Sequence, residues 1–467
     1  MRLRKQPFSF SSISTTLFFV FVSLGIASGS LTASPRLPNV TSEMERPEFW
    51  IKQIANPTNL LLTPEKIRQM NEENLGRQDL YFCGIKDLKE DWKREEILSL
   101  LKEDWEKFGK SGEGRYGKGG IPLEGSFWSE LKTKLNQESI RERGQMFYAL
   151  IIKRTDIRAF PTEEFSMSTP HYGASDRFQH SSLSPGSPIG IYHFSKDQEW
   201  AYVQTHFIRG WVRTHDLAIA KEKKEVVEYE ETKDRLVVTG NSMNVFDDPS
   251  FRQPVFLVQM GDSFPLLGIP GKTKEPSIGY VIHIPFREDN GRLTFRKAYI
   301  PVAEDLHQGF LPYTQERMAR QAFKMLHHPY GWGDKLGGRD CSRFILDLFR
   351  TFGILMPRNS REQGNVGIDL GRVEGTSEKE KRMVLDQAIP LATTLRLPGH
   401  IMLYLGKDKG RYYVIHSIWG IQRCGASGTV SEKIGRVVVS DLNLGGSCSN
   451  GSLFSRLTGV RFIGELK

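Results

Sequence analysis

The chain has 467 residues, of which 39% are hydrophobic and 25% are charged, and its formal net charge is +9. This length predicts more than one domain, and the composition excludes a mainly disordered or coiled-coil protein. Basic residues are spread along the chain without a patch in which they alternate with aromatic residues, so nucleic acid is not expected as a partner. A negatively charged polymer of the cell envelope remains compatible with this charge.

Residues 1–29 predict a secretory signal peptide. A basic start (Arg2, Arg4 and Lys5) precedes the short apolar run 16–26, and small residues follow at the expected cleavage site. The run is shorter than the roughly 20 residues that span a bilayer. We therefore expect export across the inner membrane to the periplasm, with no integral membrane domain after cleavage and a remaining net charge of about +6. An uncleaved N-terminal anchor is the alternative.

Residues 44–140 predict a helical N-terminal domain. The sequence Thr63-Pro64-Glu65 offers an N-cap, a proline in the first turn and an acidic residue, which is typical of a helix start. The segment 93–108 places its apolar residues on one helical face. No residues in this region have catalytic spacing, so we expect it to stabilise the rest of the chain.

Two sets of short strands then predict two small barrels, at 145–222 and 230–303. Apolar and polar residues alternate in both sets, between turns rich in Gly, Ser and Asp. In each set an early strand ends in a proline turn and a Gly-polar pair follows later, which predicts two diverged copies of one barrel. We expect strands at 156–162, 188–193, 200–203 and 210–212 in the first copy, and at 235–238, 243–248, 254–258, 279–283 and 293–300 in the second.

The C-terminal region, 310–467, carries a cysteine at the start of a predicted helix. Two glycines shortly precede Cys341, and the apolar residues at positions 344, 345, 348, 349 and 352 have helical spacing. The first turn of a helix favours a thiolate, because unpaired backbone N–H groups and the positive end of the helix dipole lie there. Cys341 is therefore a candidate nucleophile, and the alternative is a small buried apolar residue.

Two later strands around a five-residue turn predict the partners of this cysteine. Pairing Leu405 with Arg411 across the turn sets His400 directly opposite His416. Directly opposite side chains share one face, with Cβ atoms about 4.5 to 5.5 Å apart. One histidine would then meet the thiol and the other would hold the first. A slip of one residue would place them on opposite faces.

Each histidine alone could be a satisfied polar residue at a strand end. A metal site is another interpretation of one cysteine and two histidines, but it needs a fourth ligand or an open water position. No CxxC or HxxxH spacing accompanies these residues, so we expect no metal.

The remaining features of this region are less specific. A helix is expected at 314–326 and a turn at 329–333, and the charge run 372–382 is expected to be a solvated loop. Four cysteines in a chain of this length do not form a disulfide framework. Cys424 and Cys448 could pair in an oxidising compartment, and Cys83 is expected to be a buried apolar residue.

Three segments and one histidine carry a family resemblance: Tyr-Gly-Trp-Gly at 330–333, Arg-Asp-Cys-Ser at 339–342, Leu-Pro-Gly-His-Ile-Met-Leu-Tyr-Leu-Gly at 397–406, and His416. They resemble the NlpC/P60 family of papain-like cysteine peptidases. The resemblance extends over most of the chain, because multidomain bacterial members have the same order of parts. It implies a multidomain fold with an α-helical N-terminal region, two small all-β SH3-like barrels and a C-terminal α+β papain-like domain.

The resemblance implies a γ-D-glutamyl-L-diamino acid endopeptidase. Such an enzyme cuts the amide between D-glutamate and the diamino acid, commonly meso-diaminopimelate, of peptidoglycan stem peptides. By motif, Cys341 is the nucleophile, His400 the general base and His416 the residue that orients His400. No cofactor is implied, the expected partners are stem peptides, and a monomer is expected.

The resemblance also implies substrate contacts beside the cysteine. Asp340 and Ser342 match positions that bind the stem peptide, with Asp340 suited to a free L-alanine ammonium group. Tyr330 matches the tyrosine beside the oxyanion site. The chain departs from the family at Arg343, where glycine is usual, and a larger side chain there is expected to point outward.

Two other functions compete with the peptidase. In the first, the barrels bind the cell wall and the C-terminal domain is a scaffold, although the matching cysteine and histidines argue against it. In the second, an amidase acts on another acyl substrate with the same fold.

Overall fold

The computed structural model describes residues 36–109, 114–170, 175–271, 278–303, 305–425 and 428–465. Leu37–Lys467 form one compact unit. The predicted signal peptide, residues 1–29, lies outside the described residues. Across the described ranges, no helix is both long and apolar enough to cross a membrane.

The N-terminal helices begin where the sequence predicts them. Thr63 caps α2 by accepting a hydrogen bond from the Lys66 N–H group, and α3 covers the amphipathic segment expected at 93–108. The first two helices are α1 (Pro47–Ile51) and α2 (Pro64–Leu75), and the next two are α3 (Arg94–Phe108) and α4 (Gly125–Lys134).

These helices do not share one core, which differs from the single N-terminal domain that we expected. Apolar residues between 44 and 80 pack into the core of the C-terminal domain, where the rings of Trp50 and Tyr413 lie 5.4 Å apart. Residues between 85 and 140 pack against the first barrel instead. Each short helix has one apolar face, and it buries that face against the nearest sheet.

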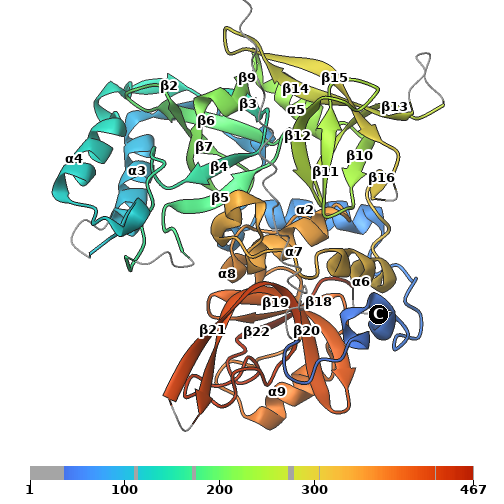
Figure 1. Ribbon diagram of the computed structural model, residues 1–467. Coiled ribbons are helices and arrows are strands. Elements are labelled where there is room, and N and C mark those ends of the chain that lie inside the picture. The colour runs from blue at the N-terminus through green and yellow to red at the C-terminus, as the bar shows by residue number, and fades with distance from the viewer. Residues whose placement is uncertain are drawn as a thin grey trace, which may run out of the picture. The chain divides into compact units, whose positions relative to one another are not determined.

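The two barrels have the same topology. The first sheet has the strand order β5-β4-β8-β7-β6-β3-β9 and the second β12-β11-β15-β14-β13-β10-β16, so corresponding strands occupy the same place in the two orders. This agreement supports the predicted duplication. Figure 1 labels most of these strands. The strands are β3 (Phe147–Ile151), β4 (Thr155–Arg158), β5 (Gln179–Leu183), β6 (Pro188–Phe194), β7 (Trp200–Gln204), β8 (Arg209–Arg213) and β9 (Leu217–Ile219), then β10 (Arg235–Val238), β11 (Ser242–Phe246), β12 (Pro254–Gln259), β13 (Ser263–Gly268), β14 (Gly279–Arg287), β15 (Leu293–Pro301) and β16 (Leu306–Gln308).

Smaller elements join these parts. The short strands β1 (Asp91–Lys93) and β2 (Arg143–Gln145) pair with each other, and helix α5 (Lys223–Glu231) connects the two barrels. The expected strands of both barrels are present, whereas β3, β5, β9, β13 and β16 had not been expected. Strands β5 and β13 were missed because polar residues or prolines interrupt their apolar pattern.

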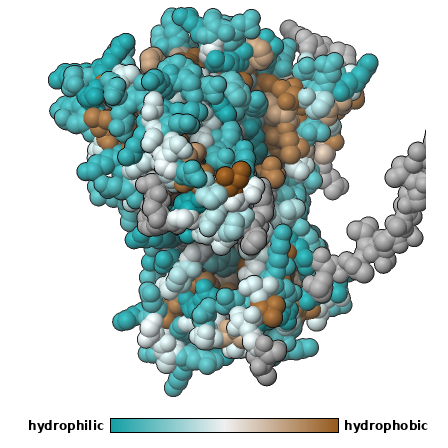
Figure 2. All heavy atoms as spheres, turned by 60° about the vertical axis from the view of Figure 1, so that its left-hand side comes forward, coloured by the Kyte–Doolittle hydropathy of each residue, from teal (hydrophilic) through white to brown (hydrophobic). Residues whose placement is uncertain are grey.

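Figure 2 shows one face of the molecule, which is mostly hydrophilic, with hydrophobic residues gathered in one part of it. Large apolar side chains that remain exposed include Val255 and Leu257 on β12 and Leu267 on β13. Strand β12 is at the edge of its sheet. The second barrel therefore keeps an apolar edge.

The C-terminal domain is a six-stranded antiparallel sheet covered by helices. Its strand order is β17-β22-β18-β19-β20-β21, and α7 packs on β19 and β20. The helices are α6 (Gln315–Lys324), α7 (Cys341–Arg350), α8 (Ser360–Gln363) and α9 (Glu378–Leu385), with the 3-10 segment η7 (Trp332–Gly337); the strands are β17 (Ile368–Asp369), β18 (Thr393–Leu397), β19 (His400–Asp408), β20 (Arg411–Gly425), β21 (Gly428–Asp441) and β22 (Gly459–Phe462).

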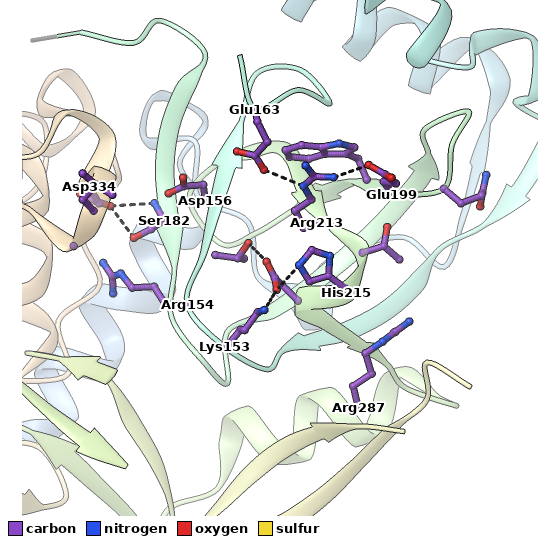
Figure 3. Close-up of a pocket in the computed structure, with 17 residues that line it drawn as sticks. Lys153, Arg154, Asp156, Glu163, Ser182, Glu199, Arg213, His215, Arg287 and Asp334 are labelled. Carbon is purple, nitrogen blue, oxygen red and sulfur yellow. Dashed lines mark hydrogen bonds and ion pairs between the residues drawn. The ribbon is translucent and has the colours of Figure 1, made fainter. Parts of the chain in front are cut away.

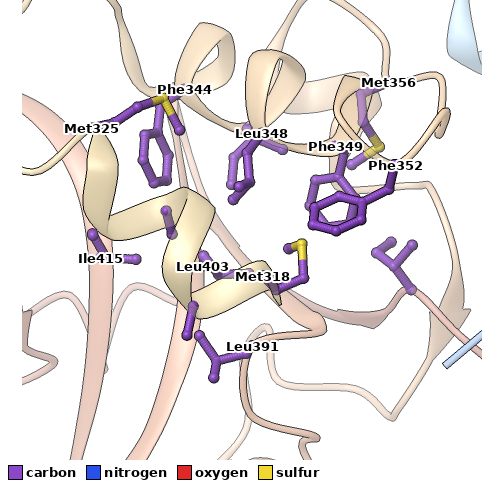
Figure 4. Packing of buried hydrophobic residues seen from close by; sticks show 14 of the residues in the cluster. Met318, Met325, Phe344, Leu348, Phe349, Phe352, Met356, Leu391, Leu403 and Ile415 are labelled. Atoms are coloured by element: carbon purple, nitrogen blue, oxygen red, sulfur yellow. The ribbon is translucent and has the colours of Figure 1, made fainter. Parts of the chain in front are cut away.

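Helix α7 is buried on all sides. Phe344, Leu348 and Phe349 face α6 and the sheet residues Leu403 and Ile415 (Figure 4). This packing fixes the helix that begins at the cysteine. The layout confirms the predicted fold class of an N-terminal helical region, two barrels and a C-terminal α+β domain.

One local prediction in this domain is wrong. The charge run 372–382 is not entirely a solvated loop, because α9 begins at Glu378. Ser377 and Glu380 form a capping box at its start, in which each side chain bonds the backbone N–H of the other. The capping signal outweighed the high charge of the segment.

Candidate active site

Cys341 is the first residue of α7 and lies at the wall of a cavity. Asp340 caps the helix, since its carboxylate accepts a hydrogen bond of 2.8 Å from the Arg343 N–H group. The cysteine side chain is 8% exposed, and its Sγ lies 4.0 Å from the carbonyl oxygen of Gly399. The cavity has a volume of about 530 Å³, and His400 and Tyr330 also line it.

The register of the histidine hairpin differs from the predicted one. The pairing of Leu405 with Arg411 is wrong, because Asp408 pairs with Arg411 and the turn is only Lys409-Gly410. Both turn residues have positive φ, 46° and 78°. This is the backbone geometry of a two-residue hairpin turn, which follows the twist of the strands better than a longer loop does.

A β-bulge keeps the two histidines on one face of the hairpin. Starting from the two-residue turn, an uninterrupted register would place His400 and His416 on opposite faces. The register shifts by one residue between Tyr404 and Gly406, which restores the shared face. The two side chains are diagonal rather than directly opposite, and His400 Nε2 lies 2.7 Å from His416 Nδ1.

A buried serine completes this chain of side chains. Ser440 on β21 is fully buried, and its Oγ lies 2.9 Å from His416 Nε2. The sequence analysis missed it. The available signal was a single hydroxyl residue after the apolar run Val437-Val438-Val439 in a strand next to His416.

The hydrogen bonds are compatible with the tautomers that a base needs. His400 Nδ1 can accept a thiol proton only if Nε2 carries the hydrogen and donates it to His416 Nδ1. His416 then carries its hydrogen on Nε2 and donates it to Ser440 Oγ. In this tautomer the two hydrogen bonds link Ser440 through His416 to His400 and leave His400 Nδ1 free to accept a proton.

We expect Ser440→Ala to lower kcat about 10- to 100-fold, because the buried His416 Nε2–H loses its acceptor and the opposite tautomer becomes favoured. The measurement is steady-state hydrolysis, with thermal melting to show that the variant is folded. Ser440→Thr, which keeps a hydroxyl group, should retain most of the activity. Equal activity of the alanine variant and the wild type would contradict the role of Ser440.

Burial favours the neutral forms of Cys341 and His400. It raises the pKa of the Cys341 thiol to about 12, with a further contribution from the charge of Asp340. Burial and the positive charge of Arg456 lower the pKa of His400 to about 4, and burial also lowers the pKa of His416. The resting site therefore holds a thiol and a neutral imidazole.

This arrangement predicts the pH dependence of catalysis. Burial and the nearby cation disfavour the imidazolium form of His400, so its pKa of about 4 keeps the base neutral well below the usual value of 6.5. We expect kcat/KM to stay constant from about pH 8 to about pH 5 and to fall only near pH 4. An acid limb at pH 6.5 or above would contradict this electrostatic environment.

Asp340 and Ser342 point into a buried polar cluster rather than into the cavity. Arg358 donates to both oxygens of the Asp340 carboxylate, at 2.7 and 3.2 Å, and to Ser342 Oγ at 2.8 Å. Gly333 N–H also donates to Asp340. Their role as substrate contacts stays a prediction, and a substrate ammonium group would have to replace Arg358.

Arg343 does not point outward, as we expected from the sequence, because its side chain is 1% exposed. Its guanidinium group donates to Asp347 and Asp334 and to the carbonyl oxygen of Ser182 in the first barrel. It therefore connects α7 to β5 of the first barrel instead of lying at a substrate edge.

A second arginine makes the matching connection to the other barrel. Arg339 donates to Asp347 and to both the side chain and the backbone of Asn241, which precedes β11. The helix that presents Cys341 is thus tied to both barrels through hydrogen bonds from two buried arginines, whose charges are paired with Asp347 and Asp334 inside the C-terminal domain.

A second cavity, of about 1060 Å³, lies where the first barrel meets Arg287 of β14 and the segment η7 (Figure 3). Each acidic residue that lines it has a cationic partner, including Asp216 with Lys153 at 2.8 Å and Glu163 with Arg213 at 2.9 Å. The described residues that line it include no cysteine. The cavity at Cys341 therefore remains the candidate active site.

A disulfide closes one wall of the cysteine cavity. Cys424 and Cys448 are bonded, which decides a pairing that the sequence left open, and Cys448 lines the cavity. Cys83 is half-buried and free. The structure as described contains no group of three or more His, Cys, Asp or Glu side chains placed to hold a metal ion.

Two family models match the chain. The model of the NlpC/P60 family matches residues 327–418, and a model described as SH3 domain (SH3b1 type) matches residues 174–213. The first match includes Tyr330, Cys341, His400 and His416, whereas Ser440 lies beyond it. No curated protein sequence matches the chain.

One solved structure shares the fold of this chain, and a second is less similar. An NlpC/P60 endopeptidase from Photobacterium damselae subsp. piscicida is 19% identical, and the match covers 89% of this chain and 96% of that protein with a TM-score of 0.71. An NlpC/P60 family protein from Bacillus cereus is 16% identical, and the match covers 68% of this chain and all of that protein with a TM-score of 0.46. The first likeness shows that the arrangement of a helical region, two barrels and a C-terminal domain recurs.

Proposed function

We propose that the C-terminal domain is an NlpC/P60 cysteine peptidase, because the model of that family matches residues 327–418, and that the protein is a γ-D-glutamyl-L-diamino acid endopeptidase. Its substrates are peptidoglycan stem peptides, cut between D-glutamate and the diamino acid in cell-wall turnover or recycling. The observation that carries the proposal is the line of Cys341, His400 and His416, in which the thiol and His400 share one cavity and the two imidazoles are 2.7 Å apart.

The proposed reaction follows from these positions. When substrate covers the cavity, His400 Nδ1 takes the proton of the Cys341 thiol, and the thiolate attacks the γ-carbonyl carbon. The backbone N–H group of Cys341 at the helix start stabilises the oxyanion, with Tyr330 beside it. His400 then gives its proton to the leaving amine as the C–N bond breaks, which leaves a thioester.

Water completes the cycle. His400, neutral again, takes a proton from the attacking water, and the thioester collapses to the free γ-carboxylate and the thiol. Two backbone N–H groups near Sγ, those of Ile401 and Ser342, lower the pKa of the thiol against the effect of burial. These groups make the transient thiolate accessible without a stable ion pair in the resting enzyme.

The cellular setting is part of the proposal. The oxidised pair Cys424 and Cys448 is compatible with export, because disulfides persist in oxidising compartments. A periplasmic location and removal of residues 1–29 stay predictions. The two barrels would hold the catalytic domain in place, since α7 is tied to both.

The test uses the purified protein and the tripeptide L-Ala-γ-D-Glu-meso-diaminopimelate. We expect release of L-Ala-γ-D-Glu and free diaminopimelate, detected by mass spectrometry. Failure to cut this peptide, its lysine-containing analogue and longer stems would overturn the proposal. Binding to cell walls without cleavage would then favour the wall-binding alternative.

A further inference from the structure

The cavity at Cys341 carries cations that lack an acidic partner. Of its lining residues, Lys433 and Arg456 are cationic and Glu432 is acidic, and Glu432 already pairs with Arg423. The Lys433 ammonium lies 4.5 Å from the centre of the Trp419 ring and makes no ion pair with any described residue. The excess of unpaired positive charge makes the cavity complementary to an anionic substrate.

Arg456 has the position that a specificity contact requires. Its guanidinium makes no ion pair or side-chain hydrogen bond with the described residues, and it is close enough to His400 that its charge lowers the pKa of the imidazole. The neighbouring Phe454 and Leu457 are buried, which fixes the loop that carries it. An anion bound to Arg456 would therefore lie beside the scissile amide.

We propose that Arg456, assisted by Lys433, binds a carboxylate of the substrate and so restricts the enzyme to acidic peptides. The inference deepens the proposed function and rests on it. A guanidinium group presents two parallel N–H donors that match a carboxylate, and both Arg456 and Lys433 are exposed, so a substrate in the cavity can reach them. Two carboxylates flank the proposed cleavage point, the α-carboxylate of D-glutamate and that of the diamino acid.

The test compares Arg456→Gln and Lys433→Gln with wild type on the stem tripeptide. We expect Arg456→Gln to raise KM about 10- to 100-fold and Lys433→Gln to raise it less, because lysine offers a single point charge. The matched control is Lys379→Gln, which removes one positive charge from the exposed surface of α9 and should leave KM unchanged.

Amidated substrates identify the carboxylate. If Arg456 contacts the α-carboxylate of glutamate, a peptide with D-isoglutamine will be cut with equal KM by wild type and Arg456→Gln. If Arg456 contacts the carboxylate of the diamino acid, amidation of that carboxylate will instead make the KM values of wild type and Arg456→Gln equal. If the ratio of the KM values of Arg456→Gln and wild type is the same for both amidated peptides as for the unmodified tripeptide, the inference is overturned.

The outcomes separate this inference from the proposed function. If wild type cuts the tripeptide and Arg456→Gln has the same KM, only the inference fails. If wild type cuts no stem peptide, the proposed function fails and the inference falls with it. A second readout is the acid limb of kcat/KM, which should move to higher pH in Arg456→Gln, since loss of the cation makes protonation of His400 easier.

Discussion

Replacement of Cys341 by alanine is expected to reduce hydrolysis of stem peptides by about 10³-fold or more, to the level of the uncatalysed background. The reason is that no acyl-enzyme can form, while the neutral His400 and His416 remain in place. The variant should fold like the wild type, because alanine favours a helix and, among the described residues, the only hydrogen bond that the thiol donates is a long one, of 4.0 Å, to the Gly399 carbonyl oxygen.

The measurement is the rate of L-Ala-γ-D-Glu release, with binding of the intact tripeptide by calorimetry as the control. Binding should persist in Cys341→Ala, because the lost atom is not among the proposed substrate contacts. Cys341→Ser should also be inactive, since the alcohol has a much higher pKa than a thiol. Release at the wild-type rate from either variant would rule out Cys341 as the nucleophile.

Replacement of Arg343 by methionine is expected to lower the free energy of unfolding by about 3–5 kcal/mol. The guanidinium is buried and holds the carboxylates of Asp347 and Asp334, so its loss leaves two buried negative charges with one arginine each. Arg343→Lys keeps the charge but not the forked geometry, and an intermediate loss is expected.

Urea unfolding followed by tryptophan fluorescence measures this effect. The control is Arg68→Met on α2, which removes an exposed i,i+3 pair with Glu65 and should change the unfolding free energy by less than about 1 kcal/mol. A similarly small change for Arg343→Met would show that the buried ion pairs of Arg343 with Asp347 and Asp334 do not stabilise the fold.

Helix starts and strand positions were readable from the sequence because they depend on neighbouring residues. The cap at Thr63 and the apolar spacing after Cys341 are local signals, and both elements form where they were predicted. The duplicated barrel was also readable, since each copy repeats its turn residues. The disulfide between Cys424 and Cys448 was left open, because pairing depends on where distant segments meet.

The histidine pair illustrates a correct conclusion reached through a wrong register. Sequence placed His400 and His416 on one face with a five-residue turn, whereas the structure has a two-residue turn and a bulge between Tyr404 and Gly406. The two differences compensate: relative to the predicted pairing they move the strand register by two residues in total, and a shift of two leaves both histidines on the same face. A bulge leaves little trace in hydrophobic alternation, so the sequence pattern did not reveal it.

By itself the sequence determined the family resemblance, the fold class and the residues Cys341, His400 and His416. Only the tertiary structure decided which side chains surround the site. It places Ser440 against His416, pairs Arg358 with Asp340, and directs Arg343 to the Ser182 carbonyl oxygen of the first barrel. Motifs and periodicity record interactions between residues that are close in the chain. Buried charges and hydroxyl groups are instead satisfied by partners from other strands and domains, which become neighbours only when the chain has folded.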